Sequence, residues 1–336
     1  MLTPQEAKMQ HIRLHNPQGM TLELMTTGAA LLSLQVPVGN GQRNVLLGCR
    51  PEDYARQHCY LNAMVGRFAN RIADAQLTRQ GTTYPLTANQ GTNCLHGGVE
   101  GFDRRELQVV DQQADRVTLQ LHSVDGDQGF PGDCDVTLTY ALEQRELVID
   151  IQATVNQPCP VNLTSHAYFN LDGKRSDIRH HRLQVNASHY LPIDAAGIPL
   201  SAAQPVEGAL DFRSERQLTQ QWLAHPQLIC AKGLDHCYLP DISEADPVAA
   251  RLTSADGQLV MEVRTNQPGL QIYTGNYLAG EPSCENEPYH DYEGIALEAQ
   301  QLPDSPNRPE LGDPWLLPGQ IYHHQTRYSF LTHVNS

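Results

Sequence analysis

The stretch Leu147–Val155, L-V-I-D-I-Q-A-T-V, alternates between two kinds of side chain. Leu147, Ile149 and Ile151 begin an apolar series, and Asp150 and Gln152 fall between its members. Successive side chains of a β-strand point to opposite faces, so this period of two predicts a strand with one buried face.

The same alternation recurs along the chain and is separated by turn signals. It is found at Val117, Leu119 and Leu121, at Leu32, Leu34 and Val36, at Val136, Leu138 and Tyr140, and at Leu259, Met261 and Val263. The turn signals are Gly39–Gly41, Asp125–Asp127, Pro131–Asp133 and Asp256-Gly257. Helical signals are few, and the best of them predicts a short helix over Ser214–His225 that Pro226 ends. We therefore predict an all-β fold, a large antiparallel β-sandwich with few short helices, as a single domain over residues 1–336.

Composition excludes several classes of partner. With 23 Lys and Arg against 38 Asp and Glu, the net charge is −15, which disfavours nucleic acid and anionic membranes as partners. No signal peptide precedes the first strand and no apolar run approaches the roughly 18 residues of a membrane helix, so we expect a cytoplasmic protein. Eight cysteines without a C-x-x-C spacing are expected to be free thiols. The sequence leaves the oligomeric state open.

The segment Val161–Leu171, V-N-L-T-S-H-A-Y-F-N-L, is the most informative for function. Read as a strand, its even positions present Asn162, Thr164, His166, Tyr168 and Asn170 on one face. A solvent-facing strand normally carries Lys, Glu or Arg, whereas a row of uncharged hydrogen-bonding groups suits a sugar. An ordinary surface strand remains the alternative.

A second strand, Gly294–Gln300, presents Glu298 among small residues that leave room for a ligand, although Glu298 could equally be solvated. Other polar candidates are individually weaker, since each could be an ordinary surface residue: Asn70, Arg71, His96, Asp235 and Gln271. The 15 histidines include no spacing typical of a metal site, so we expect no metal.

Taken together, six segments resemble the aldose 1-epimerase, or galactose mutarotase, family: G-R-F-A-N-R-I, N-C-L-H-G-G, S-H-A-Y-F-N-L, L-D-H-C-Y, L-Q-I-Y-T-G-N and A-L-E-A-Q-Q-L-P-D-S-P-N. The resemblance implies a β-sandwich that binds a small-molecule aldose in an open cleft and interconverts the α and β anomers of free hexoses such as galactose and glucose, without a cofactor. It makes His166 the general acid and Glu298 the general base. The substrate contacts that it implies are Asn70, Arg71, His96, Tyr168, Asp235 and Gln271.

The chemistry explains why such a reaction needs an acid and a base. Opening a cyclic hemiacetal removes the proton of the anomeric hydroxyl and protonates the ring oxygen. With ordinary pKa values near 4.3 and 6.5, Glu298 is expected to be ionised and His166 to keep a protonated fraction that Asp235 increases.

Two alternatives remain at this point. A hexose-6-phosphate epimerase would need a basic pocket, for which Arg67, Arg71, Arg104 and Arg105 are candidates. A non-catalytic carbohydrate-binding module would not need both His166 and Glu298.

Overall fold

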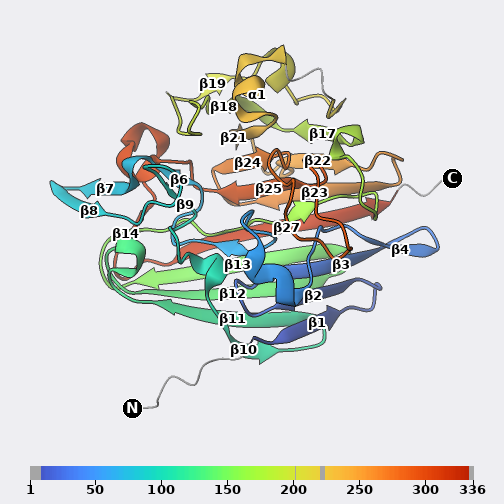
Figure 1. Ribbon diagram of the computed structural model, residues 1–336, viewed down its shortest axis with the longest axis horizontal. Coiled ribbons are helices and arrows are strands. Elements are labelled where there is room, and N and C mark those ends of the chain that lie inside the picture. The colour runs from blue at the N-terminus through green and yellow to red at the C-terminus, as the bar shows by residue number, and fades with distance from the viewer. Residues whose placement is uncertain (1–8, 201, 220–223, 333–336) are drawn as a thin grey trace.

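The computed structural model describes residues 9–200, 202–219 and 224–332 (Figure 1). It confirms the predicted all-β sandwich, which three large antiparallel sheets dominate. The nine-stranded sheet has the order β10 (Gln108–Gln112), β11 (Arg116–Ser123), β12 (Cys134–Glu143), β13 (Glu146–Val155), β27 (Tyr322–Thr332), β23 (Leu259–Thr265), β22 (Ala250–Thr253), β17 (Arg182–Val185) and β20 (Arg216–Gln217).

Two smaller sheets pack against the nine-stranded sheet. The four-stranded sheet contains β1 (His11–His15), β2 (Thr21–Met25), β3 (Leu31–Val38) and β4 (Gly41–Asn44). The six-stranded sheet has the order β16 (Tyr168–Phe169), β25 (Ile295–Gln300), β24 (Gly269–Tyr273), β21 (Asp235–Pro240), β18 (Ala187–Tyr190) and β19 (Gln204–Pro205). Short pairs join β5 (Met64–Val65) to β15 (Thr164–Ser165), β6 (Arg71–Ile72) to β9 (Cys94–Leu95), β7 (Gln76–Arg79) to β8 (Thr82–Pro85), and β14 (Cys159–Pro160) to β26 (Trp315–Leu316).

The helices of the described residues are all short. They are α1 (Pro226–Ala231) and the 3₁₀ turns Pro51–Arg56, Ala73–Ala75, Phe102–Arg104, Asp127–Gly129, Ile178–His180, Gly208–Leu210, Ser305–Asn307 and Pro309–Leu311. Over the described ranges, the chain forms no helix with the length and apolar character needed to span a membrane.

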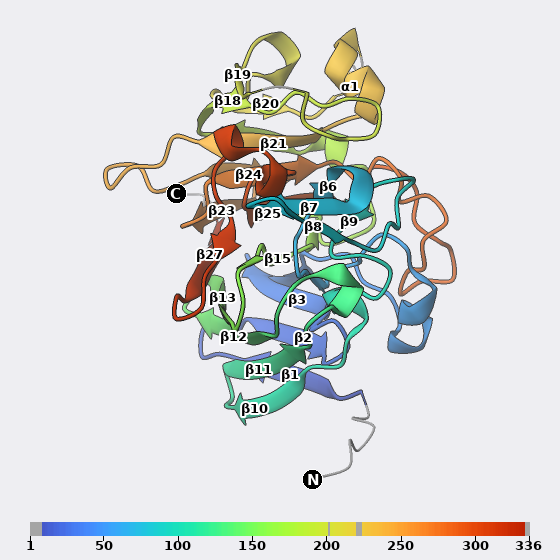
Figure 2. The same ribbon diagram turned by 90° about the vertical axis from the view of Figure 1, so that its left-hand side faces the viewer.

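Each half of the nine-stranded sheet covers one smaller sheet, as two views of the molecule show (Figures 1 and 2). On β12, Tyr140 donates from its hydroxyl to the carbonyl of Ala29, which lies between β2 and β3. On β27, Tyr328 donates to the carbonyl of Leu297 on β25, and its ring centroid lies 4.8 Å from that of Phe169 on β16. Most of the predicted apolar faces of the long strands meet in one large core, and Leu32 packs in a smaller cluster beside it.

The predicted helix over Ser214–His225 is wrong in the part that is described. Arg216 and Gln217 form strand β20, and positions 220–223 lie outside the described residues. The helix begins at Pro226 instead of ending there. Proline fits the first helical position because the amide it lacks would have no partner there, and the ring of His225 caps the helix by accepting from the amide of Gln227.

The segment Val161–Leu171 is also not one strand. It bends through β15, which pairs with β5, and β16, which pairs with β25. Every residue of the segment is buried, and Leu163 and Phe169 pack in the core. The residues of the predicted polar face do not all serve one surface, however. The side-chain amides of Asn162 and Asn170 donate hydrogen bonds to the backbone carbonyls of Ala69, Ser176 and Glu293. Those two side chains fasten neighbouring loops, and they do not line the cavity described next.

Candidate active site

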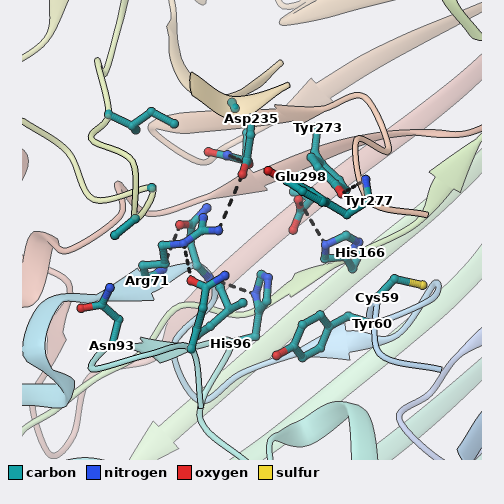
Figure 3. Close-up of a pocket in the computed structure, with 18 of the residues that line it drawn as sticks. Cys59, Tyr60, Arg71, Asn93, His96, His166, Asp235, Tyr273, Tyr277 and Glu298 are labelled. Carbon is teal, nitrogen blue, oxygen red and sulfur yellow. Dashed lines mark hydrogen bonds and ion pairs between the residues drawn. The ribbon is translucent and has the colours of Figure 1, made fainter. Parts of the chain in front are cut away.

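One open cavity of about 540 Å³ brings together all eight site residues predicted from the sequence. Its floor is the face of β25, β24 and β21, and its walls come from β6, β9 and the bend between β15 and β16 (Figure 3). The eight residues are His166, Glu298, Asn70, Arg71, His96, Tyr168, Asp235 and Gln271. Segments more than 200 positions apart in the sequence thus meet at one point.

Strand register sets the polar residues of the floor. Gln271 on β24 lies directly opposite Glu298 on β25. Asp235 on β21 is held beside them, because the side-chain amide of Gln271 donates to its Oδ1 at 2.6 Å. The other amide atom, Oε1 of Gln271, is buried and has no hydrogen-bond partner among the described residues.

The His166 ring is positioned by its backbone and by aromatic neighbours. Its amide donates to the carbonyl of Ala63, and its carbonyl accepts from the amide of Asn62. The ring centroid of Tyr168 lies 4.8 Å from that of His166. Tyr168 donates its hydroxyl to the carbonyl of Cys59 at 3.0 Å, so this tyrosine presents mainly its ring to the cavity.

His166 and Glu298 form a buried pair at the centre of the cavity (Figure 3). Nε2 of His166 lies 3.7 Å from Oε1 of Glu298, and the two side chains are 6% and 2% exposed. Nδ1 of His166 and Oε2 of Glu298 have no hydrogen-bond partner in the described chain. Buried polar atoms in native proteins nearly always have partners, so this arrangement is typical of a site that a polar ligand completes.

Burial reverses the ionisation expected from ordinary pKa values. It lowers the pKa of His166 to about 4, and the opposing effect of the charge on Asp235 is smaller. Burial also raises the pKa of Glu298 well above its usual value, and the charge of Asp235 adds to that rise. The expectation that His166 keeps a protonated fraction near neutrality is therefore wrong for this buried ring, because removing an imidazolium from water costs more free energy than the nearby carboxylate returns.

The backbone fixes the tautomer of His96. Nδ1 of His96 accepts from the amide of Asn70 at 3.1 Å, and the His96 amide donates to the Asn70 carbonyl. Burial lowers the pKa of His96 well below its usual value, so the ring is neutral and its proton is on Nε2.

This tautomer bears on metal binding. His96, His166 and Glu298 bring one possible ligand atom each within 4.8 Å of one another. A metal needs a lone pair from each imidazole, but Nδ1 of His96 is already used by the Asn70 amide and Nε2 carries the proton. The arrangement thus suits donation to an oxygen atom better than metal coordination.

Arg71 lines the cavity from β6 and extends toward Asp235 on β21. Its Nε donates to Oε1 of Gln90 at 2.7 Å, and its NH2 group lies 3.7 Å from Oδ2 of Asp235. Gly197 packs directly on the guanidinium: a Cβ at this position would lie 2.6 Å from Cζ of Arg71. The loop Leu302–Asn307 supports the same strand, since Asp304 donates its amide to the Arg71 carbonyl.

Comparison with known proteins agrees with this geometry. The pattern of the family described as "Aldose 1-epimerase" matches residues 10–329. The chain belongs to the aldose 1-epimerase family. It is 45% identical to the aldose 1-epimerase of Escherichia coli (strain K12), over 98% of this chain and 97% of that protein. It is 36% identical to the galactose mutarotase of Homo sapiens, over 93% of this chain and 91% of that protein.

Solved structures of the aldose 1-epimerase family share the whole fold. An aldose epimerase homologue from C. elegans superposes with a TM-score of 0.89 at 28% identity, covering 96% of this chain and 99% of that one. Galactose 1-epimerase from Lactobacillus acidophilus NCFM gives a TM-score of 0.86 at 29% identity, covering 98% and 97%.

Several lining residues of this aldose 1-epimerase cavity were not predicted from the sequence. The most prominent are Tyr60, Tyr277, Gln90 and the loop Asp194–Gly197. Tyr60 packs edge-on against His96 with ring centroids 4.5 Å apart. None of them lies in a strand of alternating pattern, so no periodic signal could have found them. Tyr273 is different, because its place on the Gln271 face was readable from the sequence.

Proposed function

We propose that this chain is an aldose 1-epimerase, an isomerase that interconverts the α and β anomers of free aldoses, with the hexoses galactose and glucose as substrates. The observation that carries the proposal is the buried His166 and Glu298 pair, which has unpartnered polar atoms and lines a cavity rich in hydrogen-bonding side chains. The names of the relatives, aldose 1-epimerase and galactose mutarotase, agree with it.

In the proposed mechanism, Glu298 is the general base and His166 is the general acid. Glu298 removes the proton of the anomeric hydroxyl while His166 protonates the ring oxygen, which opens the ring to the aldehyde. Both oxygens are bonded to C1 of the sugar, so two groups 3.7 Å apart can reach them together. Rotation about C1–C2 then presents the other face of the aldehyde, and reclosure runs the two proton transfers in reverse.

Burial favours one of the two protonation states that the His166 and Glu298 pair passes through in this cycle. The pair holds one proton, which is on His166 before ring opening and on Glu298 while the sugar is open. The raised pKa of Glu298 and the lowered pKa of His166 both favour the second form. The site thus stabilises the protonation state that accompanies the open-chain aldehyde, and ring opening requires the less populated form with the proton on His166.

The remaining polar residues are proposed to bind sugar hydroxyls. Arg71 and the Nε2 proton of His96 are donors, whereas Asp235 and Oε1 of Gln271 are acceptors. Asn70 bonds the Arg71 amide through its side chain at 2.8 Å, so it also positions its neighbour. No metal or other cofactor enters this mechanism.

The charge of the cavity argues against a sugar phosphate as substrate. Of the four arginines that could have formed a phosphate pocket, Arg71 alone lines this cavity in the described chain. Arg67 is buried outside the cavity, where its guanidinium donates to backbone carbonyls, and Arg105 forms an ion pair with Asp127. The cavity also carries four acidic residues, which would repel a phosphate: Asp194, Asp235, Glu281 and Glu298.

Polarimetry tests the proposed function. Freshly dissolved α-D-galactose and α-D-glucose should reach their equilibrium rotation faster with the protein than without it, and glucose 6-phosphate should not. A carbohydrate-binding module would bind these sugars without any acceleration, and that result would overturn the proposal.

We also propose that residues 1–336 act as one domain in the cytoplasm. The family pattern spans residues 10–329, and the nine-stranded sheet combines strands from Gln108 to Thr332. The eight cysteines are unpaired, as in a reducing compartment.

A further inference from the structure

A second polar pocket lies beside the catalytic cavity. It has a volume of about 300 Å³, at the lower end of the range for small-molecule sites. It shares His58 and Tyr60 with the catalytic cavity. Its lining residues are Gln57, His58, Tyr60, Asn89, Gly98, Val99, Asp103 and Arg104.

The chemistry of this second pocket is that of a hydroxyl-binding site. Asp103 is 2% exposed, and its Oδ1 has no hydrogen-bond partner in the described chain. Its Oδ2 lies 3.7 Å from Nε of Arg104, beyond hydrogen-bond distance. A buried carboxyl and a guanidinium that do not bond each other leave acceptors and donors for a ligand. Their charges cancel, which disfavours both a phosphate and a cation.

Tyr60 is the wall between the two pockets. Its backbone is in the left-handed region, with φ of 56°, which is a rare and costly conformation for a bulky residue and is common at functional sites. One side of the ring lies against His96 and within 6.0 Å of the His166 ring centroid. On the other side, its hydroxyl accepts from Nδ2 of Asn89 at 3.3 Å.

Asn89 connects the second pocket to His96. Its Oδ1 accepts from the Leu95 amide at 2.7 Å, and its Nδ2 also donates to the Leu95 carbonyl. Leu95 precedes His96 on the chain. A molecule bound to Asn89 and Tyr60 would therefore contact the ring that packs on His96 and the side chain that bonds the residue before it.

We propose that this second pocket binds an uncharged polyol, such as a second molecule of aldose, separately from the catalytic cavity. The inference rests on the proposed function only for the choice of sugar as the ligand. Val99 at the rim of the second pocket and Ile193 in the catalytic cavity provide one reporter methyl for each site.

The test follows these two methyl groups by NMR while galactose is added to the full chain. We expect both to shift, with separate midpoints. Galactitol, which has no anomeric carbon, should also shift Val99. Arg104→Gln should raise the galactose concentration at the Val99 midpoint about tenfold, the usual order for losing a charged hydrogen bond. It should leave the midpoint of Ile193 unchanged.

The matched control is Arg105→Gln, which alters the neighbouring arginine that bonds Asp127 outside the second pocket. It should leave both midpoints as in the unmodified chain. The inference fails if Val99 stays unmoved while Ile193 saturates, or if the two methyls share one midpoint that Arg104→Gln does not separate. Absence of mutarotation by polarimetry would overturn the proposed function and leave the Val99 result standing.

Discussion

Two central strands, β13 and β25, present carboxylates in opposite environments. On β13, Asp150 faces outward, and its Oδ2 lies 2.8 Å from Nε2 of His323, with the two side chains 25% and 47% exposed. On β25 every residue is buried, and Glu298 faces His166 across a wider gap of 3.7 Å. The two pairs have the same chemical composition, carboxylate and imidazole.

The difference in environment changes what each pair can do. Partial burial raises the pKa of Asp150, but hydrogen bonds from His323 and Gln325 outweigh it and the net shift is downward. At Glu298 burial is not compensated and the pKa rises. A solvated ion pair adds little to stability and no reactivity, whereas a desolvated pair without hydrogen-bond partners is poised to exchange protons with a ligand.

The largest expected effect comes from removing the base or the acid of the buried pair. Glu298→Gln keeps the shape of the side chain and removes the base, so kcat should fall by about 10²–10⁴, the usual contribution of general acid–base catalysis. His166→Asn should lose a similar factor. The double variant should be little worse than either single one, because residues that act as a unit are non-additive.

Asp150→Asn and His323→Asn are the matched controls on the exposed pair. Polarimetry, with the spontaneous rate subtracted, should find both close to the unmodified chain. If Glu298→Gln kept near-normal turnover, Glu298 would be a hydroxyl acceptor only, and Asp235 would be the next candidate for the base.

Two glycines extend the comparison. Gly81 and Gly197 have similar φ values of +81° and +79°, but a Cβ at position 81 would meet open space, whereas one at position 197 would clash with Arg71. Gly197→Ala should displace the guanidinium and lower kcat/KM about 10- to 100-fold, as small misplacements of binding groups do. Gly81→Ala carries the same backbone strain and should leave kcat/KM unchanged. Equal losses in both variants would assign the effect to strain.

Stability at acid pH should also depend on the buried pair. The pKa of His166 is about 4 in the folded chain, against about 6.5 when unfolded, so the unfolded chain binds more protons between these values. The contribution of the neutral ring is therefore present above pH 6.5 and lost as pH falls toward 4. Between pH 7 and pH 5 this amounts to about 2 kcal/mol.

His166→Asn removes this titration. Its free energy of unfolding, measured by urea denaturation, should fall less between pH 7 and pH 5 than that of the unmodified chain. An unchanged difference between the two pH values would contradict the buried, neutral state of the ring.

A smaller effect is expected from the charge of Asp235. That charge raises the pKa of Glu298, the proposed general base, so Asp235→Asn should lower this pKa and move the acid limb of kcat/KM to lower pH. Asp150→Asn on the exposed pair should leave the limb where it is. The profile is measured by polarimetry, and a limb that moved upward would show that Asp235 acts by another route.

Metal removal should have no effect. Because the His96 tautomer offers a proton and not a lone pair, dialysis against EDTA should leave the rate unchanged. Loss of activity that zinc or manganese restored would refute this mechanism.

Much of the fold was readable from local pattern. The strands predicted around Leu34, Leu119, Leu138, Ile149 and Met261 all form, because a period of two needs only one apolar face to bury. The helix near residue 220 was misplaced because a proline can begin a helix as well as end one.

The sequence by itself determined the strand pattern, the family and eight of the residues that meet in the cavity. Tertiary structure alone decided their ionisation, since the pKa of His166 depends on how completely other segments remove water from it. It also decided that Asn162 and Asn170 fasten loops and that Tyr60 separates two pockets. Alternation states which side a residue faces, but only the packing of distant segments determines whether that side meets solvent, a loop or a ligand cavity.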